Sequence, residues 1–230
     1  MRALVAAVAA VLVLGGCHVA GTAKPDRATS ACLNLGGTVG SGDSCEIHSA
    51  TATYTISMRF PTDYPDQDAI ADFLTQRRKD FIDWVDAAGQ VRTMPAALDV
   101  IGKAYRSGND GGGTRSLVLS LGEDTGVHPV TTYKAFNYSL AAHVPITFDT
   151  LFKPGSNPVA VLKPFVAQQA LARDRKAGKA VDDLTADSYQ QFAITDDAII
   201  FFFNQDGLLP HEVGPFEVTV PRSALASILA

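Results

Sequence analysis

The chain has 230 residues, carries a formal net charge of −5 and is 47% hydrophobic. A chain of this length suits one domain of about 150 to 200 residues plus a tether. Such a domain buries close to 70% of the surface that its unfolded chain exposes. Charges of both signs are mixed without a basic stripe, so nucleic acid is a poor partner. The acidic balance also gives no attraction to anionic lipid heads.

The first 16 residues have the pattern of a lipoprotein signal peptide. Arg2 is followed by an apolar run, residues 3–16, which is shorter than the about 20 apolar residues that a spanning helix needs. Residues 14–17 (LGGC) resemble the lipobox of bacterial lipoproteins, in which the cysteine thiol is acylated and the signal is cut before it. We therefore expect lipid on Cys17. The alternative is an ordinary secreted chain in which Cys17 survives.

Lipid on Cys17 predicts a membrane as partner and an extracytoplasmic location, at the cell membrane or the cell surface. Each buried methylene of an acyl chain contributes about 0.8 kcal/mol, so two or three chains hold a protein to a membrane almost permanently. Residues 17–30 are small and polar and include a proline, which is typical of a flexible tether. We expect residues 31–230 to form a single domain behind this tether.

The cysteine count favours one disulfide. Lipidation of Cys17 leaves Cys32 and Cys45, which are separated by a Gly/Ser-rich stretch too flexible to hold itself. Disulfides persist in export compartments, so we predict a Cys32–Cys45 bridge that stabilises by roughly 3 kcal/mol through loop closure. Two free thiols are the alternative.

In chain order, hydrophobic periodicity predicts a strand, a long helix and three further strands. Residues 51–60 alternate apolar and polar side chains without error, as a strand with one buried face does. Apolar residues then recur near helical spacing between Pro65 and Gly89, which predicts an amphipathic helix over 66–88. The strands that follow are predicted at 97–106, 114–122 and 130–138, with a hairpin tip at 107–113.

The C-terminal half predicts a second helix and three strands. The helix covers 156–178, and Pro164 is expected to make its first turn and a half irregular or kinked. The strands are expected at 191–195, 198–204 and 216–221, followed by a short helix at 222–230. The run IIFFF is apolar on both faces, which indicates a central strand. Together these elements predict an α+β fold with a mostly antiparallel mixed sheet, two longer helices packed on it and a short C-terminal helix.

Sequence motifs for catalysis or metal binding are missing. The chain contains no G-x-S-x-G pentad and no S-x-x-K, which weakens an esterase hypothesis without excluding a triad assembled in space. No His or Cys pair stands at ligand spacing, so we expect neither a metal nor a cofactor. The histidines are scattered along the chain: His18, His48, His128, His143 and His211.

Two segments are candidates for a binding surface. Residues 126–138 combine a histidine and a lysine with three aromatic side chains. Residues 203–215 form a long loop between two strands, and loops on rigid sheets often carry function. For residues 126–138, the structural alternative is that Gly126 and Pro129 shape a turn, His128 caps it by hydrogen bonds, and the aromatic side chains belong to the core. For residues 203–215, the alternative is a solvated loop. The candidate residues are His128, Tyr133, Lys134, Tyr138, His211 and Glu212.

Four stretches in the same order, residues 64–67, 126–138, 145–152 and 189–224, resemble the mycobacterial secreted immunogenic protein family. That family shares its C-terminal domain of unknown function with RsiV-type lysozyme-sensing anti-sigma factors. The resemblance implies an exported, often antigenic α+β domain without agreed catalytic residues, although relatives are sometimes labelled esterases. A lysozyme-like partner follows from the resemblance alone. The lipobox stands where the anti-sigma factors have a transmembrane helix and a cytoplasmic segment.

The sequence therefore supports three hypotheses. The leading one is a lipid-anchored envelope protein whose domain binds a protein or envelope ligand without catalysis. The second is a weak carboxylesterase acting on short acyl esters or lipids. The third is a structural antigen of the envelope with no specific small ligand.

Overall fold

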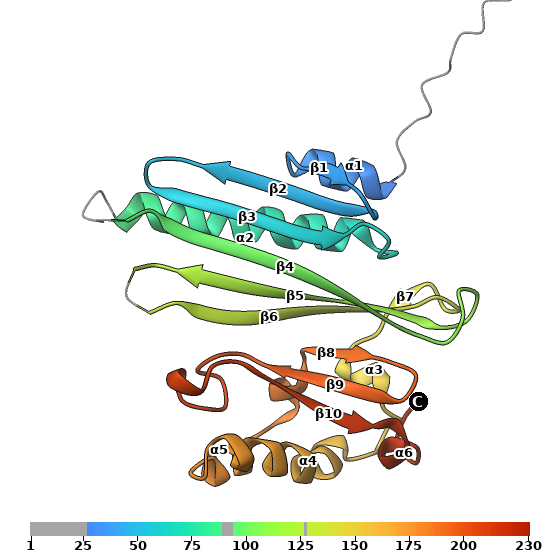
Figure 1. The fold of residues 1–230 in the computed structure, drawn as a ribbon. Coiled ribbons are helices and arrows are strands. Elements are labelled where there is room, and N and C mark those ends of the chain that lie inside the picture. The colour runs from blue at the N-terminus through green and yellow to red at the C-terminus, as the bar shows by residue number, and fades with distance from the viewer. Residues whose placement is uncertain (1–26, 89–93, 127) are drawn as a thin grey trace, which may run out of the picture.

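The structure of the protein, a computed structural model, describes residues 27–88, 94–126 and 128–230. It contains a seven-stranded sheet in the order β1-β2-β3-β4-β5-β6-β7 and a three-stranded sheet in the order β10-β9-β8 (Figure 1). All neighbouring strands are antiparallel except β3 and β4. The predicted α+β class is confirmed, with α2 and α4 as the two longer helices and α6 as the short C-terminal one.

The strands are β1 (Thr38–Gly40), β2 (Ser44–Ala50), β3 (Tyr54–Pro61), β4 (Ala96–Ser107), β5 (Thr114–Asp124), β6 (Val130–Ser139), β7 (Val144–Pro145), β8 (Phe192–Ile194), β9 (Ala198–Phe203) and β10 (Phe216–Pro221). The helices are α1 (Arg27–Asn34), α2 (Gln67–Ala88), α3 (Phe148–Leu151), α4 (Pro158–Arg173), α5 (Gly178–Asp182) and α6 (Arg222–Leu225), with short 3₁₀ helices η1 (Ala186–Tyr189) and η2 (His211–Val213).

One core lies between the large sheet and α2. The alternation predicted for 51–60 is confirmed over β3, where Ile56, Met58 and Phe60 are buried. They pack against the apolar face of α2, which buries Leu74 and Phe81 among others. Helix α2 also explains the parallel pair, because parallel strands need a crossover connection and the 22-residue helix provides it between β3 and β4.

A second core lies between the small sheet and α4. Strand β9 is the middle strand of that sheet and is buried on both faces, as its apolar run predicts. Phe201 and Phe203 face the cluster that contains Leu162 and Val166 of α4. Phe202 points the other way, into a small cluster with Val118 of β5 and neighbouring residues. The small sheet is therefore covered by α4 on one side and packs on β4 to β6 of the large sheet on the other (Figure 1).

The edge of the large sheet is held by side-chain amides from the segments that flank strands β8 and β9 of the small sheet. Strand β6 pairs with β5 along its length, but with β7 only at its last two residues. The outward N–H groups of Thr131, Tyr133 and Ala135 donate instead to amide oxygens at 2.9, 2.7 and 2.7 Å. These oxygens belong, in that order, to Gln205, Asn204 and Gln191. We call this row the amide ladder.

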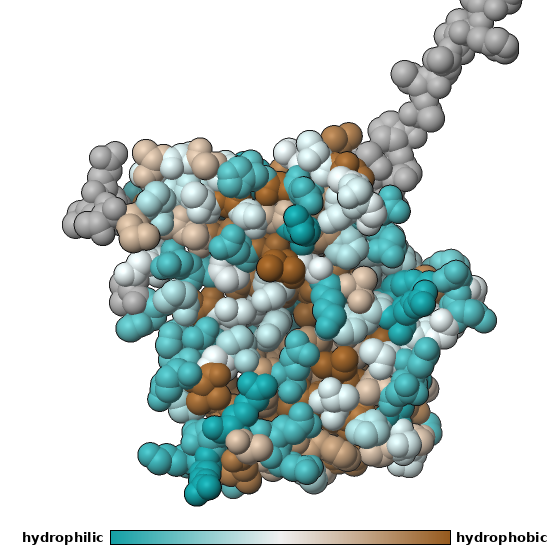
Figure 2. Space-filling model, in the orientation of Figure 1, coloured by the Kyte–Doolittle hydropathy of each residue, from teal (hydrophilic) through white to brown (hydrophobic). Residues whose placement is uncertain are grey.

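The surface in the view of Figure 2 is mostly hydrophilic, with hydrophobic residues in separate patches. The large apolar side chains that are most exposed stand on different parts of the fold. Met94 is 74% exposed just before β4, Ile101 is 63% exposed on β4, Leu33 is 52% exposed on α1 and Leu171 is 41% exposed on α4. Hydropathy alone thus does not single out one docking patch among the described residues.

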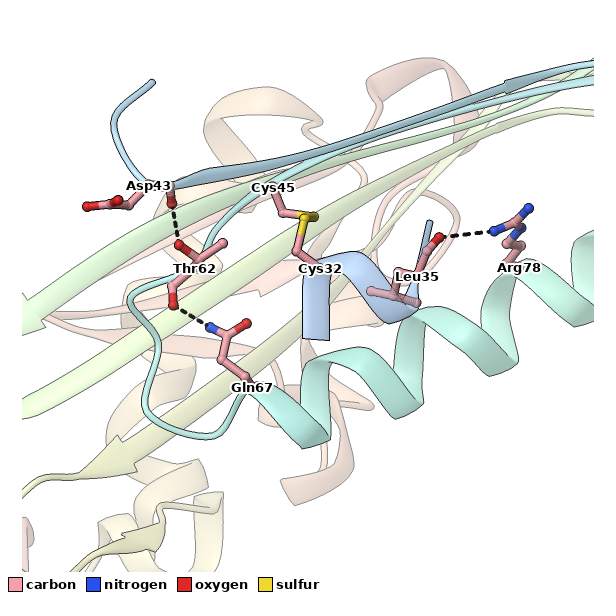
Figure 3. Close-up of a disulfide and its surroundings, with 7 residues drawn as sticks. All are labelled: Cys32, Leu35, Asp43, Cys45, Thr62, Gln67 and Arg78. Carbon is pink, nitrogen blue, oxygen red and sulfur yellow. Dashed lines mark hydrogen bonds between the residues drawn. A yellow bond between two sulfur atoms is a disulfide. The ribbon is translucent and has the colours of Figure 1, made fainter. Parts of the chain in front are cut away.

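The disulfide predicted between Cys32 and Cys45 is confirmed. It joins α1 to β2, with a sequence separation of 13 residues (Figure 3). Both cysteines are fully buried, and the backbone at Gly37 packs so closely that an added Cβ would lie 2.9 Å from either sulfur. Arg78 of α2 donates to the carbonyl of Leu35 at 3.2 Å, which ties the disulfide-linked segment to the main helix.

The structure corrects several predicted element boundaries. The segment between the cysteines is more ordered than predicted, because β1 and the start of β2 lie within it and pair. Residues 51–53 belong to a turn, since Thr51 Oγ1 accepts from the N–H groups of residues 53 and 54. The C-terminal helix ends at Leu225 rather than at residue 230, because Ala230 donates to the carbonyl of Leu151 in backbone pairing instead.

The second helix also differs from its prediction. Helix α4 is regular from Pro158 onwards and continues through Pro164, with the side chain of Asn157 accepting from Ala160 at the N-terminus. The expected irregular first turn is therefore wrong. The helix ends at Arg173 instead of residue 178, because Asp174 adopts an extended conformation.

Gly102 provides a test of packing between β3 and β4. A Cβ at this position would lie 2.6 Å from Cβ and 2.9 Å from Cα of Phe60. Because overpacking forces backbone shifts, we expect Gly102→Ala to lower the free energy of unfolding by about 1–3 kcal/mol in urea denaturation. Gly122→Ala is the matched control, since a Cβ at Gly122 would lie 3.8 Å from its nearest atom, the carbonyl oxygen of Asp99. Equal effects in both variants would contradict this account.

The amide ladder predicts a chemically specific loss of stability. Gln191→Ala leaves the N–H of Ala135 without its acceptor, so we expect the free energy of unfolding to fall by about 1–3 kcal/mol. Gln191→Glu retains an oxygen at that place and should lose clearly less. Gln190→Ala, one residue away and exposed, should change stability by no more than about 0.5 kcal/mol. A Glu variant as unstable as the Ala variant would show that the oxygen is not what matters.

Candidate functional site

The loop between β9 and β10 meets the start of β6 and brings two predicted site residues together. The rings of His128 and His211 have centroids 5.4 Å apart in an edge-to-face arrangement. His128 is exposed and His211 is partly exposed on η2, with Glu212 exposed beside it. The two candidate segments, 126–138 and 203–215, thus form one surface at this point.

His211 is held by a carboxylate. Its Nδ1 lies 2.9 Å from Oδ2 of Asp206. Asp206 has a φ of +61°, in the left-handed region, which aspartate tolerates better than most residues. The turn is closed by a hydrogen bond from the N–H of Gly207 to the carbonyl of Asn204. This turn therefore sets the carboxylate against the imidazole.

The amide of Gln205 lies against the same imidazole. Its Nε2 is 3.2 Å from Nε2 and 3.3 Å from Nδ1 of His211, and it donates to the His211 carbonyl at 3.0 Å. Its oxygen accepts from Thr131 in the amide ladder, and its own N–H donates to the Thr131 carbonyl. The position of His211 is thus fixed by the same contacts that join the two sheets.

The remaining residues of the predicted surface point to two different faces. Tyr133 lies between the sheets, with its ring centroid 5.2 Å from that of Phe202, and burial is the largest cause that raises the pKa of its phenol. Lys134 lies on the opposite face, 5.4 Å from the centroid of the Phe136 ring. Tyr138 lies on that opposite face too, where it packs against Tyr64.

The candidates on β6 therefore do not form one surface with the histidines. The aromatic side chains of this strand are half-buried packing residues, in agreement with the structural alternative considered for residues 126–138.

His143 and His48 lie elsewhere. His143 has a φ of +56° in the turn between β6 and β7, where its N–H donates to Ser139, so it has a local structural role. His48 on β2 stands opposite Ser57 on β3, and Ser57 pairs in turn with Asp99 on β4. This row was not predicted, because His48 lies on β2, a strand that the hydrophobic pattern did not indicate.

The row on β2 to β4 lies beside an open groove of about 360 Å³ that includes His48, Ser57 and the ion pair Glu46–Arg59 among its lining residues. Ser57 stands between the histidine and the aspartate, whereas a triad needs the histidine in the middle. No hydrogen bond joins these three side chains in the described residues. The row is therefore a polar sheet face and not an assembled triad.

Chemically, Asp206 and His211 form a carboxylate–imidazole pair in which the carboxylate orients the ring through Nδ1. Across residues 27–88, 94–126 and 128–230, the side chains hydrogen-bonded to a histidine ring are Gln205 and Asp206. Over the same ranges, no three His, Cys, Asp or Glu residues gather as a metal site would require. None of the helices described is both long and apolar enough to span a membrane.

The predicted lipidation site, Cys17, lies outside the described residues. The structure starts at residue 27, where α1 begins within the range predicted for the tether. Lipidation thus stays a prediction from the sequence.

Comparison with solved structures supports the fold. A DUF3298 family protein from Pseudomonas aeruginosa matches with a TM-score of 0.58 at 15% identity, covering 81% of this chain and 94% of the other. A DUF3298 family member from Bacteroides fragilis matches with a TM-score of 0.52 at 15% identity, covering 84% and 95%. These likenesses concern the fold alone.

Comparison with known sequences identifies the family. The family described as a protein of unknown function (DUF3298) matches residues 149–223. Esterase Rv3036c of Mycobacterium tuberculosis is 44% identical over 230 residues, covering 98% of both chains. Immunogenic protein MPB64 of Mycobacterium bovis and immunogenic protein MPT64 of M. tuberculosis are each 35% identical over 236 residues, covering 100% of both chains. The chain therefore belongs to the mycobacterial immunogenic protein family, and its residues 149–223 match DUF3298.

Proposed function

We propose that this protein is an exported, lipid-anchored envelope protein whose folded part binds a protein or envelope ligand without catalysis. Export is supported by the Cys32–Cys45 disulfide, a bond that persists in oxidising compartments. The names of the immunogenic relatives agree with a location where the protein meets the outside. The anchor rests on the LGGC sequence at residues 14–17.

The observation that favours binding over catalysis is the position of the Gln205 amide. In an acyl-transfer enzyme, the imidazole held by a carboxylate receives the proton of a nucleophile on its other side. Here Nε2 of Gln205 lies 3.2 Å from Nε2 of His211, and that amide is committed to Thr131 and to the His211 carbonyl. The same nitrogen lies 3.3 Å from Nδ1, so the fixed amide covers the imidazole between both ring nitrogens. Within the described residues, the side-chain partners of the His211 ring are thus an amide and a carboxylate, and neither is a nucleophilic hydroxyl.

Ester hydrolysis is the second candidate, because two observations favour it. The pair Asp206–His211 has the geometry of a positioned general base. A full-length relative at 44% identity is named an esterase. If this protein hydrolyses esters, His211 is the histidine whose geometry best suits that role.

Lipid anchoring predicts that Cys17→Ala abolishes acyl labelling, because only a thiol accepts the lipid. We expect an uncleaved or mislocalised precursor that takes up no radiolabelled fatty acid in cells. Wild type is labelled in parallel as the positive control, and the 32–45 disulfide is checked in both. Equal acyl labelling of the variant and of wild type would contradict lipid anchoring at Cys17.

The binding hypothesis predicts at most trace hydrolysis of short p-nitrophenyl esters. Any trace should fall by less than about tenfold in His128→Ala and in His211→Ala, since a true general base contributes about 10² to 10⁴. His143→Ala is the matched control, because His143 lies in an exposed turn. A hundredfold loss confined to a folded His211→Ala would make the esterase hypothesis the better one.

A further inference from the structure

A small pocket lies beside the amide ladder, between η1 and the turn that follows β9. Its volume is about 170 Å³. The lining combines four apolar residues with polar ones from both elements: Leu184, Asp187, Ser188, Gln191, Phe202, Phe203, Asn204, Gly207 and Leu208. Pockets that enclose drug-sized ligands have about 300–1,000 Å³, so this one fits a small chemical group.

Two amides of the ladder, Gln191 and Asn204, line this pocket. Each directs its oxygen at a backbone N–H of β6, at 2.7 Å in both cases. An N–H can be satisfied only by the oxygen end of an amide, so the orientation of both side chains is fixed by chemistry. Their backbones are held as well, since the Gln191 carbonyl accepts from Phe202 and the Asn204 carbonyl accepts from Gly207.

The fixed orientation leaves the nitrogen ends of both amides available. Neither Nε2 of Gln191 nor Nδ2 of Asn204 has an acceptor within the described residues, and neither nitrogen is among the fully buried unpartnered atoms. Two preoriented N–H₂ groups at one pocket are suited to donate to a carbonyl oxygen of a ligand.

The other lining residues narrow the chemistry of that ligand. No basic side chain lines the pocket, and the carboxylate of Asp187 is exposed beside it, which disfavours an anion. The same carboxylate can accept a hydrogen bond from an N–H group. Phe203, Leu208 and Leu184 are buried and supply apolar walls for a methyl group.

We propose that this pocket binds an acetamido group, with its carbonyl on the amides of Gln191 and Asn204 and its N–H on Asp187. The methyl group packs against Phe203, Leu208 and Leu184. Acetylated sugars and acetylated amines carry this group. The assignment rests on the proposed binding function and gives it a ligand class, but it does not depend on lipid at Cys17.

The test uses the full-length chain in detergent micelles and N-acetylglucosamine as probe. We expect saturation-transfer NMR to show magnetisation passing to the acetyl methyl group more than to the ring protons, with millimolar affinity. Glucose, which lacks the acetamido group, should give no comparable signal. An absent methyl signal up to about 50 mM probe, or an equal signal with glucose, would overturn the proposal.

Isosteric variants test the two donors separately from the fold. Gln191→Glu and Asn204→Asp keep the oxygen that accepts from β6 but replace the N–H₂ donor, so each should weaken binding about tenfold. Gln190→Glu is the matched control, because it adds the same charge one residue away and lies outside the pocket lining. Equal weakening in all three variants, or none in the first two, would refute the assignment.

A second measurement covers the case in which these variants fail to fold. In wild type, the side-chain N–H₂ cross-peaks of Gln191 and Asn204 should shift saturably as N-acetylglucosamine is added, while that of Gln190 stays unchanged. Unmoved cross-peaks of Gln191 and Asn204 would refute binding of the acetamido group at this pocket. Acyl labelling at Cys17 reports on the anchor alone, so failure of the pocket and failure of the anchor are distinguishable.

Discussion

The free edge of β6 is the constraint on which the arrangement of the two sheets depends. A buried backbone N–H without a partner costs about 1–3 kcal/mol, and β7 pairs with only the last two residues of this strand. The protein satisfies three of these groups with Gln205, Asn204 and Gln191. These amides stand next to β8 and β9. The hydrogen bonds that satisfy the edge of β6 are therefore the same ones that attach the small sheet to the large sheet. The amide ladder also protects the edge of β6, which could otherwise pair with a strand of another chain.

Much of the fold follows from local patterns in the sequence. The alternation in β3, the amphipathic α2 and the two-sided apolar run of β9 each identify their element, because one face or both faces must be buried. Strand β2 escaped prediction, since its apolar alternation amounts to little more than Cys45 and Ile47. The premature end of α6 depends on backbone pairing with Leu151, which no local pattern shows.

The candidate site was predictable only in part, for a physical reason. His128 and His211 were identified as residue types that carry chemistry, but their ring contact joins segments that are distant in the chain. The bonds of the amide ladder join residues 56 to 74 positions apart. A glutamine or asparagine at the end of a strand has no local signature for such a role. Alternation did place Tyr133 and Lys134 on opposite faces, and this could have shown that they do not share a surface.

Because the ladder uses amides, the interface between the sheets also presents N–H₂ groups of fixed orientation. Ser116 shows the simpler solution, because its hydroxyl accepts from Ile194 at 3.0 Å in the same interface. Asn137 uses its other end, donating to Phe192, and its oxygen is then buried without a partner. In Gln191 and Asn204, the amide oxygen accepts from a backbone N–H of β6, and the N–H₂ group remains as a donor at the pocket that both residues line. Since an amide cannot turn without breaking the ladder, the contacts that hold the sheets together also fix the direction of the groups left for a ligand.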